Sequence, residues 1–326
     1  MKNGIRQNGL VPAGDAHISY QGRWLQNENS YVCSFEGHLS LRFISARIAL
    51  AGPANGTAYM VLDHGEPKKI TLSDGLVLAE NLGPGEHLLS LYAPWQLSFI
   101  RVGGFLLDEN AETLPIQPTA TVEFIGDSIM EGYCNPIDGC EKFGNNSSMI
   151  SYATLTGRIL AKEKGIAFNV IAYGGIGIGN GPRPDFDFMV MADRYKKVRE
   201  YLHTDTPETP VDDWDFSRFV SDVLCVNLGT NDWGVTSETF KEKYHAYLAD
   251  LKTYYPNLKT IILMTPFCGT KAEEIRQVVS EENDPRVILC DSALWDIPNG
   301  SKDVHPAPAS HEIAAEKLAD FLGKLL

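Results

Sequence analysis

The sequence predicts an all-β part followed by an α/β domain with a parallel sheet. Before about residue 115, short segments of β character alternate with glycine- and proline-rich turns, which is typical of a β-sandwich or jelly roll. From residue 121 onward, strand-like and helical segments alternate, which is typical of a parallel sheet with helices on both faces. Residues 109–119 are polar and end in P-I-Q-P-T, so we expect a linker there and place the domains at residues 1–115 and 116–326.

The β-rich part contains eight segments with strand propensity and no clear helix. They are residues 17–20, 31–35, 39–44, 47–51, 57–62, 69–72, 87–92 and 97–105. Turn signals such as Gly52-Pro53 and Gly83-Pro84-Gly85 stand between them. Many short strands of this kind predict a jelly-roll sandwich.

The α/β part begins with a buried strand and continues as strand–helix units. Strands are expected at residues 122–125, 168–172, 223–227, 260–264 and 287–290, and helices at residues 149–164, 237–255, 271–280 and 309–326. Ser237 and Glu238 are expected to cap their helix, and Pro256 follows its end. The irregular, proline-rich residues 180–218 are expected to form one side of an entrance.

Composition excludes several classes of function. The 326 residues carry a formal net charge of −14, whereas nucleic-acid-binding surfaces are basic. No apolar run approaches the ~18 residues of a membrane span. The N-terminus lacks the apolar core of an export signal, so we expect a cytoplasmic protein, with secretion as the alternative if an export signal has been removed. The six cysteines form no cluster with zinc-ligand spacing, and neither nucleotide-binding glycine motif is present, so no metal or cofactor is expected.

The first candidate for chemistry is the stretch V-E-F-I-G-D-S-I-M-E-G at residues 122–132. A strand ends there, Gly126 allows a sharp turn, and Ser128 follows at the carboxyl end. Open α/β sheets bind their ligands at that edge. The alternative is a turn in which Ser128 is only a helix cap.

Three further motifs each follow a predicted strand or precede the last helix. The loop A-Y-G-G-I-G-I-G-N-G at residues 172–181 offers backbone N–H groups to an oxyanion, or is an ordinary flexible loop. The N-L-G-T-N-D-W segment offers the Asn231 amide, unless this residue only caps a turn. His305 lies in a proline-restricted loop, where it faces a pocket or solvent. His311, His245 and His203 are expected at the surface.

The order Ser, Gly, Asn, His resembles the SGNH (GDSL-type) hydrolase superfamily, a three-layer, flavodoxin-like fold. The matching blocks are G-D-S-I, the glycine loop, G-T-N-D and D-x-H-P, over about residues 120–326. The preceding sandwich, with Y-Q-G-R-W at residues 20–24, is similar to carbohydrate esterase family 2, whose members remove acetyl groups from plant polysaccharides. H-G-E-P at residues 64–67 departs from that family's pattern.

The resemblance implies a mechanism with Ser128 as nucleophile and His305 as its general base. The implied oxyanion hole consists of the Ser128 N–H, the Gly175 N–H and the Asn231 amide, with any glycine between 174 and 177 open as an alternative. The superfamily usually places an aspartate three residues before the histidine, where this chain has Lys302. Asp303, two residues before, is the candidate third member, and a serine–histidine dyad is the alternative.

The resemblance also implies a substrate, namely acetylated oligosaccharides of xylan or mannan. Trp233, Tyr133 and Trp295 are expected to contact the sugar because they lie next to the motifs. No nucleic acid or membrane partner is expected, and the oligomeric state is open. Two alternatives remain: a thioesterase or lipase of the same superfamily, and a carbohydrate-binding protein whose hydrolase domain is inactive.

Overall fold

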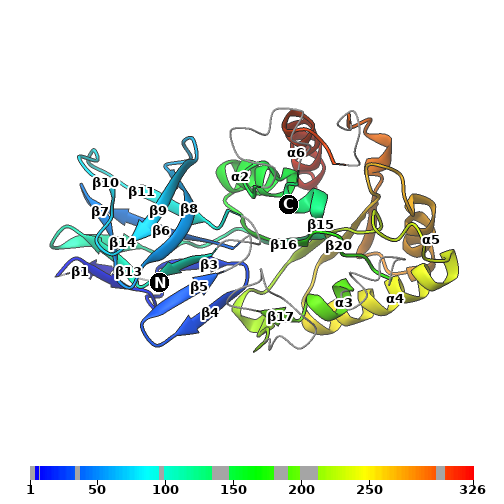
Figure 1. Cartoon of the computed structure of the whole chain (residues 1–326), viewed down its shortest axis with the longest axis horizontal. Coiled ribbons are helices and arrows are strands. Elements are labelled where there is room, and N and C mark those ends of the chain that lie inside the picture. The colour runs from blue at the N-terminus through cyan, green and yellow to red at the C-terminus, as the bar shows by residue number, and fades with distance from the viewer. Residues whose placement is uncertain are drawn as a thin grey trace. The chain divides into compact units, whose positions relative to one another are not determined.

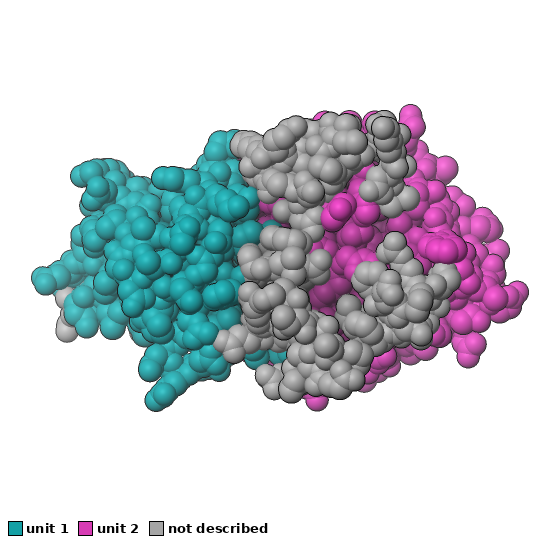
Figure 2. Space-filling model, in the orientation of Figure 1, with its two compact units in different colours: residues 1–118, 198–211 teal, residues 119–197, 212–326 magenta. Residues whose placement is uncertain are grey.

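The computed structural model describes residues 4–6, 8–33, 37–94, 99–133, 147–179, 190–198, 212–298 and 305–326. The chain divides into two compact units (Figure 2). One comprises Met1–Pro118 and Val198–Val211, and the other comprises Thr119–Lys197 and Asp212–Leu326. Each is described by itself.

The first unit is an antiparallel β-sandwich. Its described strands are β1 (Gly4–Arg6), β2 (Leu10–Pro12), β3 (Ile18–Gln21), β4 (Trp24–Asn27), β5 (Ser30–Cys33), β6 (His38–Ile44), β7 (Ile48–Ala51), β8 (Asn55–Leu62), β9 (Lys68–Ser73), β10 (Val77–Ala79), β11 (His87–Tyr92), β12 (Ile100–Val102), β13 (Gly104–Leu107) and β14 (Ala111–Leu114). One sheet runs β1-β14-β6-β11-β8-β12-β5-β4, with β3 on β6 and β9 on β8, and the other runs β10-β7-β13-β2. The predicted all-β sandwich is confirmed.

Alternation along the strands builds the core of this sandwich. In β6, Leu39, Leu41 and Phe43 are fully buried, whereas Arg42 between them is exposed. Successive side chains of a strand point to opposite faces, so one face of β6 supplies the core. Trp24 is fully buried in the same core, and its indole N–H donates to the Gln21 carbonyl at 2.8 Å.

The second unit contains the predicted parallel sheet. Its strands are β15 (Thr121–Asp127), β16 (Ala167–Tyr173), β19 (Val223–Asn227), β20 (Thr260–Met264) and β21 (Val287–Cys290), in the order β16-β15-β19-β20-β21. Numbered along the chain, this order is 2-1-3-4-5, which is the flavodoxin-like arrangement. The direction of winding reverses between β15 and β19, and ligand sites of such sheets lie at that point.

Helices cover both faces of the sheet (Figure 1). They are α1 (Ser128–Glu131), α2 (Tyr152–Lys164), α3 (Met191–Arg194), α4 (Ser237–Tyr254), α5 (Ala272–Glu282) and α6 (Pro308–Gly323); η4 (Phe216–Arg218) and η5 (Ser292–Leu294) are 3-10 turns, and β17 (Lys197–Val198) pairs with β18 (Asp212–Asp213). Phe124 packs against Phe168, which lies against α2. The neighbouring Glu123 points the other way and accepts hydrogen bonds from the hydroxyls of Tyr195 and Tyr255.

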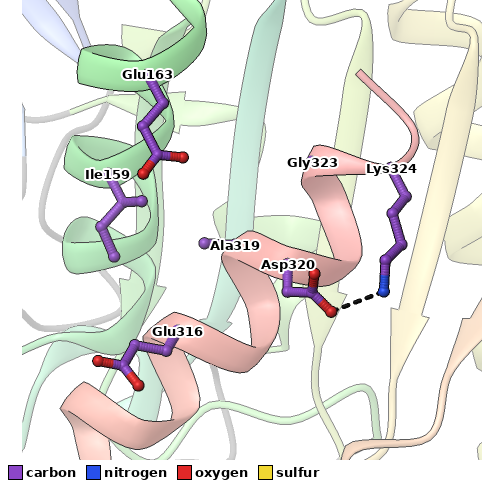
Figure 3. A pocket seen from close by; sticks show the side chains of 7 residues that line it. All are labelled: Ile159, Glu163, Glu316, Ala319, Asp320, Gly323 and Lys324. Carbon is purple, nitrogen blue, oxygen red and sulfur yellow. Dashed lines mark hydrogen bonds and ion pairs between the residues drawn. The ribbon is translucent and has the colours of Figure 1, made fainter.

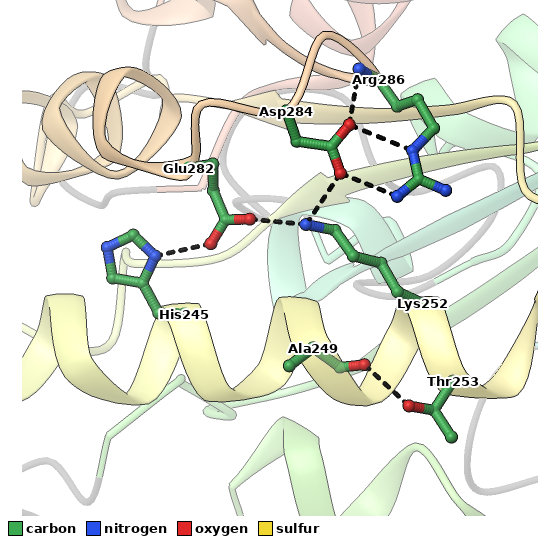
Figure 4. A network of polar contacts seen from close by, with 7 residues as sticks. All are labelled: His245, Ala249, Lys252, Thr253, Glu282, Asp284 and Arg286. Carbon is green, nitrogen blue, oxygen red and sulfur yellow. Dashed lines mark hydrogen bonds and ion pairs between the residues drawn. The ribbon is translucent and has the colours of Figure 1, made fainter.

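The start of α4 and one of its histidines differ from the sequence prediction. Thr236 is the cap, with its side chain accepting from the Thr239 N–H at 3.3 Å, and Ser237 is already helical. His245, expected at the surface, is half-buried, and its Nδ1 lies 2.6 Å from Glu282 (Figure 4). Lys252 of the same helix contacts Glu282 at 2.6 Å, and this polar network joins α4 to the end of α5.

A groove runs between the C-terminal halves of α2 and α6 (Figure 3). Its lining includes Glu163 and Ile159 of α2 and Glu316 and Asp320 of α6. Both helices run antiparallel to the strands they pack on, so their C-terminal ends lie towards the amino ends of those strands. The groove is therefore on the side of the unit opposite to the carboxyl edge of the sheet.

A substitution at Gly157 tests how tightly α2 packs on the sheet. A Cβ there would lie 2.3 Å from Cδ2 of Phe168, so the ring or the helix would have to shift. Alanine in place of a helical glycine ordinarily stabilises a protein by up to about 1 kcal/mol. Because overpacking outweighs this gain, Gly157→Ala should lower the free energy of unfolding by about 1–3 kcal/mol in urea titrations.

Gly323 of α6 is the matched control, since its nearest neighbour to a new Cβ is Lys164 Cε at 3.6 Å. Gly323→Ala should leave stability unchanged or slightly higher. A Gly157→Ala protein as stable as the wild type would show that α2 is not packed tightly on Phe168.

Candidate active site

Ser128 is placed by a sharp turn at the end of the central strand. β15 ends at Asp127, which caps α1 by accepting the Ile129 N–H on its Oδ1 at 3.0 Å. A Cβ on Gly126 would lie 2.5 Å from the Met130 Cβ, so only glycine allows α1 to fold back this closely. Ser128 is 8% exposed and stands at the first helical position.

The structure brings Ser128 and His305 together. The Ser128 Oγ lies 2.9 Å from the His305 Nε2, although the residues are 177 positions apart. His305 lies just before α6, and the Tyr133 ring packs against its imidazole with centroids 4.3 Å apart. A hydroxyl within hydrogen-bond distance of an imidazole is the geometry of a nucleophile and its general base.

Strand register places the glycine loop, residues 174–179, beside this pair. Asp127 of β15 pairs with Tyr173 of β16, and Gly126 of β15 pairs with Asn227 of β19. The segments that follow these three strands therefore leave the sheet at the same level. The Ile176 N–H donates to the Tyr173 carbonyl at 3.2 Å and Gly175 has φ +78°, which together form a type II turn.

Two consecutive side chains beyond β19 contact the glycine loop. The Asn231 Nδ2 donates to the Ile176 carbonyl at 2.8 Å, which uses one of the two N–H groups of that amide. The Asp232 carboxylate accepts the Ile178 N–H at 3.1 Å and the Gly179 N–H at 2.7 Å. Asn231 and the glycine loop, predicted separately from the sequence, are therefore in direct contact.

Three buried carboxyl groups, those of Asp127, Glu131 and Asp232, lie in the segments around Ser128, and the sequence predicted no role for them. Burial raises the pKa of Asp127 to about 6. Burial, together with the nearby charge of Asp127, raises the pKa of Glu131 to about 8. Burial also raises the pKa of Asp232. The sequence indicates these buried carboxyl groups only weakly, because the sole sign is an acidic residue within an otherwise apolar stretch of a motif.

The remaining predicted site residues differ in their surroundings. Trp233 follows Asp232 and is 67% exposed. Trp295 is half-buried, with its ring 6.3 Å from the Phe267 ring. The Tyr133 ring packs against the imidazole of His305, the candidate general base. Asp303 lies outside the described residues.

His311 corrects the prediction of a surface histidine. It is fully buried in the first turn of α6. Its Nδ1 accepts the Tyr152 N–H at 3.3 Å, so Nε2 carries the proton and donates to the Tyr133 carbonyl at 3.4 Å. The imidazole therefore satisfies an N–H at the start of α2 and holds the segment that carries Tyr133.

Within the described ranges, no group of three or more His, Cys, Asp or Glu side chains is arranged to hold a metal ion. Among the same residues, no helix combines the length and apolar character needed to span a bilayer.

The fold and the Ser–His pair define a class of protein. The model of the GDSL-like lipase/acylhydrolase family matches residues 122–318, and the chain belongs to this family. It is 27% identical to the cellulase/esterase CelE of Acetivibrio thermocellus over 94% of this chain, and it spans 39% of that protein's length. It is 22% identical to an acetylxylan esterase/glucomannan deacetylase of Cellvibrio japonicus, covering 97% of this chain and 91% of that protein.

Two solved structures match this chain over 94% or more of its length. A family two carbohydrate esterase from Clostridium thermocellum, in complex with cellohexaose, is 26% identical with a TM-score of 0.69, covering 94% of this chain and 99% of that one. A family two carbohydrate esterase from Cellvibrio japonicus shares the fold, with 20% identity, a TM-score of 0.77 and coverage of 99% and 98%. The predicted resemblance to this family is confirmed.

The raised pKa of Glu131 predicts that the stability of the fold depends on pH. With a folded-state pKa of about 8 and an ordinary value of 4.5, the folded chain keeps a proton that the unfolded chain releases. Stability therefore falls as the pH rises from about 4.5 to about 8. Glu131→Gln removes this effect and should raise the melting temperature by about 5 °C at pH 8–9, with little difference at pH 4–5.

Exposed Glu163 of α2 supplies the control: Glu163→Gln should give a melting curve parallel to the wild type at every pH. Parallel curves for Glu131→Gln as well would show that Glu131 ionises normally in the folded protein.

His311 predicts a loss of stability in acid. Burial lowers its pKa to about 4, so between pH 6.5 and 4 only the unfolded chain binds the proton. Stability is lost as the pH falls through this window, by up to about 3 kcal/mol. His311→Gln should flatten the pH dependence of chemical denaturation there. His38, whose pKa burial lowers to about 3, keeps part of the slope; an unchanged slope in the variant would contradict the assignment.

Proposed function

We propose that this chain is a serine esterase that removes O-acetyl groups from saccharides derived from plant polysaccharides, such as acetylated xylan or mannan oligosaccharides. The observation that carries the proposal is the 2.9 Å contact between Ser128 Oγ and His305 Nε2. Membership of the GDSL-like family supports ester chemistry. Relatives named as an acetylxylan esterase/glucomannan deacetylase and as a carbohydrate esterase with bound cellohexaose support a saccharide substrate.

In the proposed mechanism His305 acts first as a base and then as an acid. Nε2 takes the hydroxyl proton of Ser128 as Oγ attacks the acetyl carbonyl carbon. The tetrahedral intermediate collapses when the protonated imidazole gives this proton to the leaving sugar oxygen, which frees the sugar hydroxyl. Water then attacks the acetyl-serine and loses a proton to His305. The imidazolium returns this proton to Ser128 Oγ as the ester bond breaks, so the free serine is restored, and acetic acid leaves and ionises to acetate.

The oxyanion of each tetrahedral intermediate would be held by three donors. They are the Ser128 N–H, the Gly175 N–H and the second N–H of the Asn231 amide. The turn at Gly175 and the shared strand level support this arrangement. Removal of one such donor typically costs about 100- to 1,000-fold in rate.

The orientation of His305 and the binding of the sugar complete the proposal. The Tyr133 ring on the imidazole limits rotation of His305, whether Asp303 or a backbone carbonyl serves as the partner of Nδ1. Trp233, exposed just beyond β19, is suited to stack on a sugar ring. Trp295 on its short turn would line the same edge of the sheet.

Replacing the nucleophile tests the proposal. Ser128→Ala should lower acetate release from acetylated xylo- and manno-oligosaccharides by at least about 1,000-fold, because the acyl-enzyme cannot form. Acetate is measured by an enzymatic assay, and saccharide binding by calorimetry. Ser280→Ala, on the exposed face of α5, should behave as the wild type.

The other outcomes identify the alternatives. A folded wild type that binds oligosaccharides without releasing acetate would be the carbohydrate-binding protein. Release from long-chain or thioester substrates alone would identify a lipase or thioesterase.

A further inference from the structure

We propose that Asp232 is the positioning residue of the oxyanion hole: its carboxylate holds the glycine loop at the level of Ser128. The proposal rests on the proposed function, in which an N–H of this loop stabilises the oxyanion. Asp232 itself touches neither substrate nor reacting atoms in this assignment. It acts through residues 174–179.

The first argument is the pair of hydrogen bonds from the loop to one carboxylate. The Gly179 N–H meets Oδ1 at 2.7 Å and the Ile178 N–H meets Oδ2 at 3.1 Å. A carboxylate offers two acceptor oxygens and no donor, so each N–H group meets its own oxygen and no donor of the side chain opposes either contact. Asp232 is fully buried, so water does not compete for these contacts.

The backbone of Asp232 is rigid enough to serve as an anchor. Its N–H donates to the Gly229 carbonyl at 3.1 Å, and its carbonyl accepts the Val235 N–H at 3.0 Å. These turns lie directly beyond β19, whose last residue pairs with Gly126 next to the nucleophile turn. The position of the carboxylate is therefore tied to the strand that neighbours Ser128.

At Gly177 and Gly179, the loop has no room for a side chain beside Asp232 and Val235. A Cβ on Gly177 would lie 2.7 Å from both Asp232 oxygens, and a Cβ on Gly179 would lie 2.9 Å from Val235. The glycines of this motif therefore serve the close approach of loop and carboxylate. The neighbouring Asn231 also contacts this loop, because its amide donates to the Ile176 carbonyl. The position of the Asn231 amide is therefore coupled to that of the Gly175 N–H, the other expected oxyanion donor.

The consequence for catalysis is geometric. Oxyanion donors act only within about 2.7–3.1 Å of the developing charge, and a displacement of about 1 Å costs on the order of 100-fold in rate. In Asp232→Asn, one oxygen still accepts an N–H, but the new amide directs its own N–H groups at the other donor. Asp232→Ala loses both contacts.

The test measures the loop and the chemistry separately. Hydrogen exchange at the Ile178 and Gly179 amides, read by mass spectrometry, should be faster in Asp232→Asn and fastest in Asp232→Ala. With 4-nitrophenyl acetate, kcat should fall about 10- to 100-fold in Asp232→Asn and further in Asp232→Ala, with KM changed less than about threefold. Gly177→Ala, which displaces the carboxylate from the other side, should match Asp232→Asn.

Gly83→Ala is the matched control, because a Cβ there meets no atom within 4 Å. It should leave exchange and kcat at wild-type values. Faster exchange at residues 178 and 179 with kcat unchanged would overturn the proposal. So would a loss confined to KM. If Asp232→Ala does not fold, Asp232→Asn and Gly177→Ala decide the matter.

A phosphonate ester that modifies Ser128 separates this proposal from the proposed function. Its reaction also forms an oxyanion but requires no saccharide or acetyl group. A wild type that reacts with the phosphonate but releases no acetate would remove the acetylesterase assignment, and slower phosphonylation in Asp232→Asn would still support the positioning role. An equal phosphonylation rate in the two proteins would overturn that role.

Discussion

The parallel register of β16, β15 and β19 is the constraint on which the site depends. Asp127 opposite Tyr173 and Gly126 opposite Asn227 bring three chain segments out of the sheet at one level. A slip of one residue in β15 would turn every side chain of the strand to the other face. It would exchange Phe124, which packs on Phe168, with Glu123, which accepts from the Tyr195 and Tyr255 hydroxyls, so these contacts specify the register. Ser128 and the glycine loop are neighbours because their strands are paired.

Burying acidic groups around Ser128 has a free-energy cost that the structure offsets with hydrogen bonds from backbone N–H groups. Asp127 caps α1, and Asp232 accepts two N–H groups of the glycine loop. Hydrogen bonds to carboxylates are stronger than neutral ones, which suits them to fixing loops that must not move. Glu131 is different, since burial favours its protonated form, in which it adds no charge beside Ser128.

His305 is held by packing as much as by polar contacts. The Tyr133 ring lies against its imidazole, and the carbonyl of the same tyrosine accepts from His311. His311 in turn receives the first N–H of α2. One buried histidine thus joins the start of α2, the start of α6 and the segment beside His305, so the helix layer on this face of the sheet supports the contact between Ser128 and His305.

The sequence by itself determined the local features: the sandwich, the alternating strands and helices, the turn at Gly126 and the order of the Ser, Gly, Asn and His motifs. These follow from propensity and periodicity, which act over a few residues. It misplaced His311 and overlooked Asp232, because the burial of a polar side chain depends on which helix or loop packs over it. Only the tertiary structure decided the contact between Ser128 and His305, since residues 177 positions apart meet through strand order and helix packing.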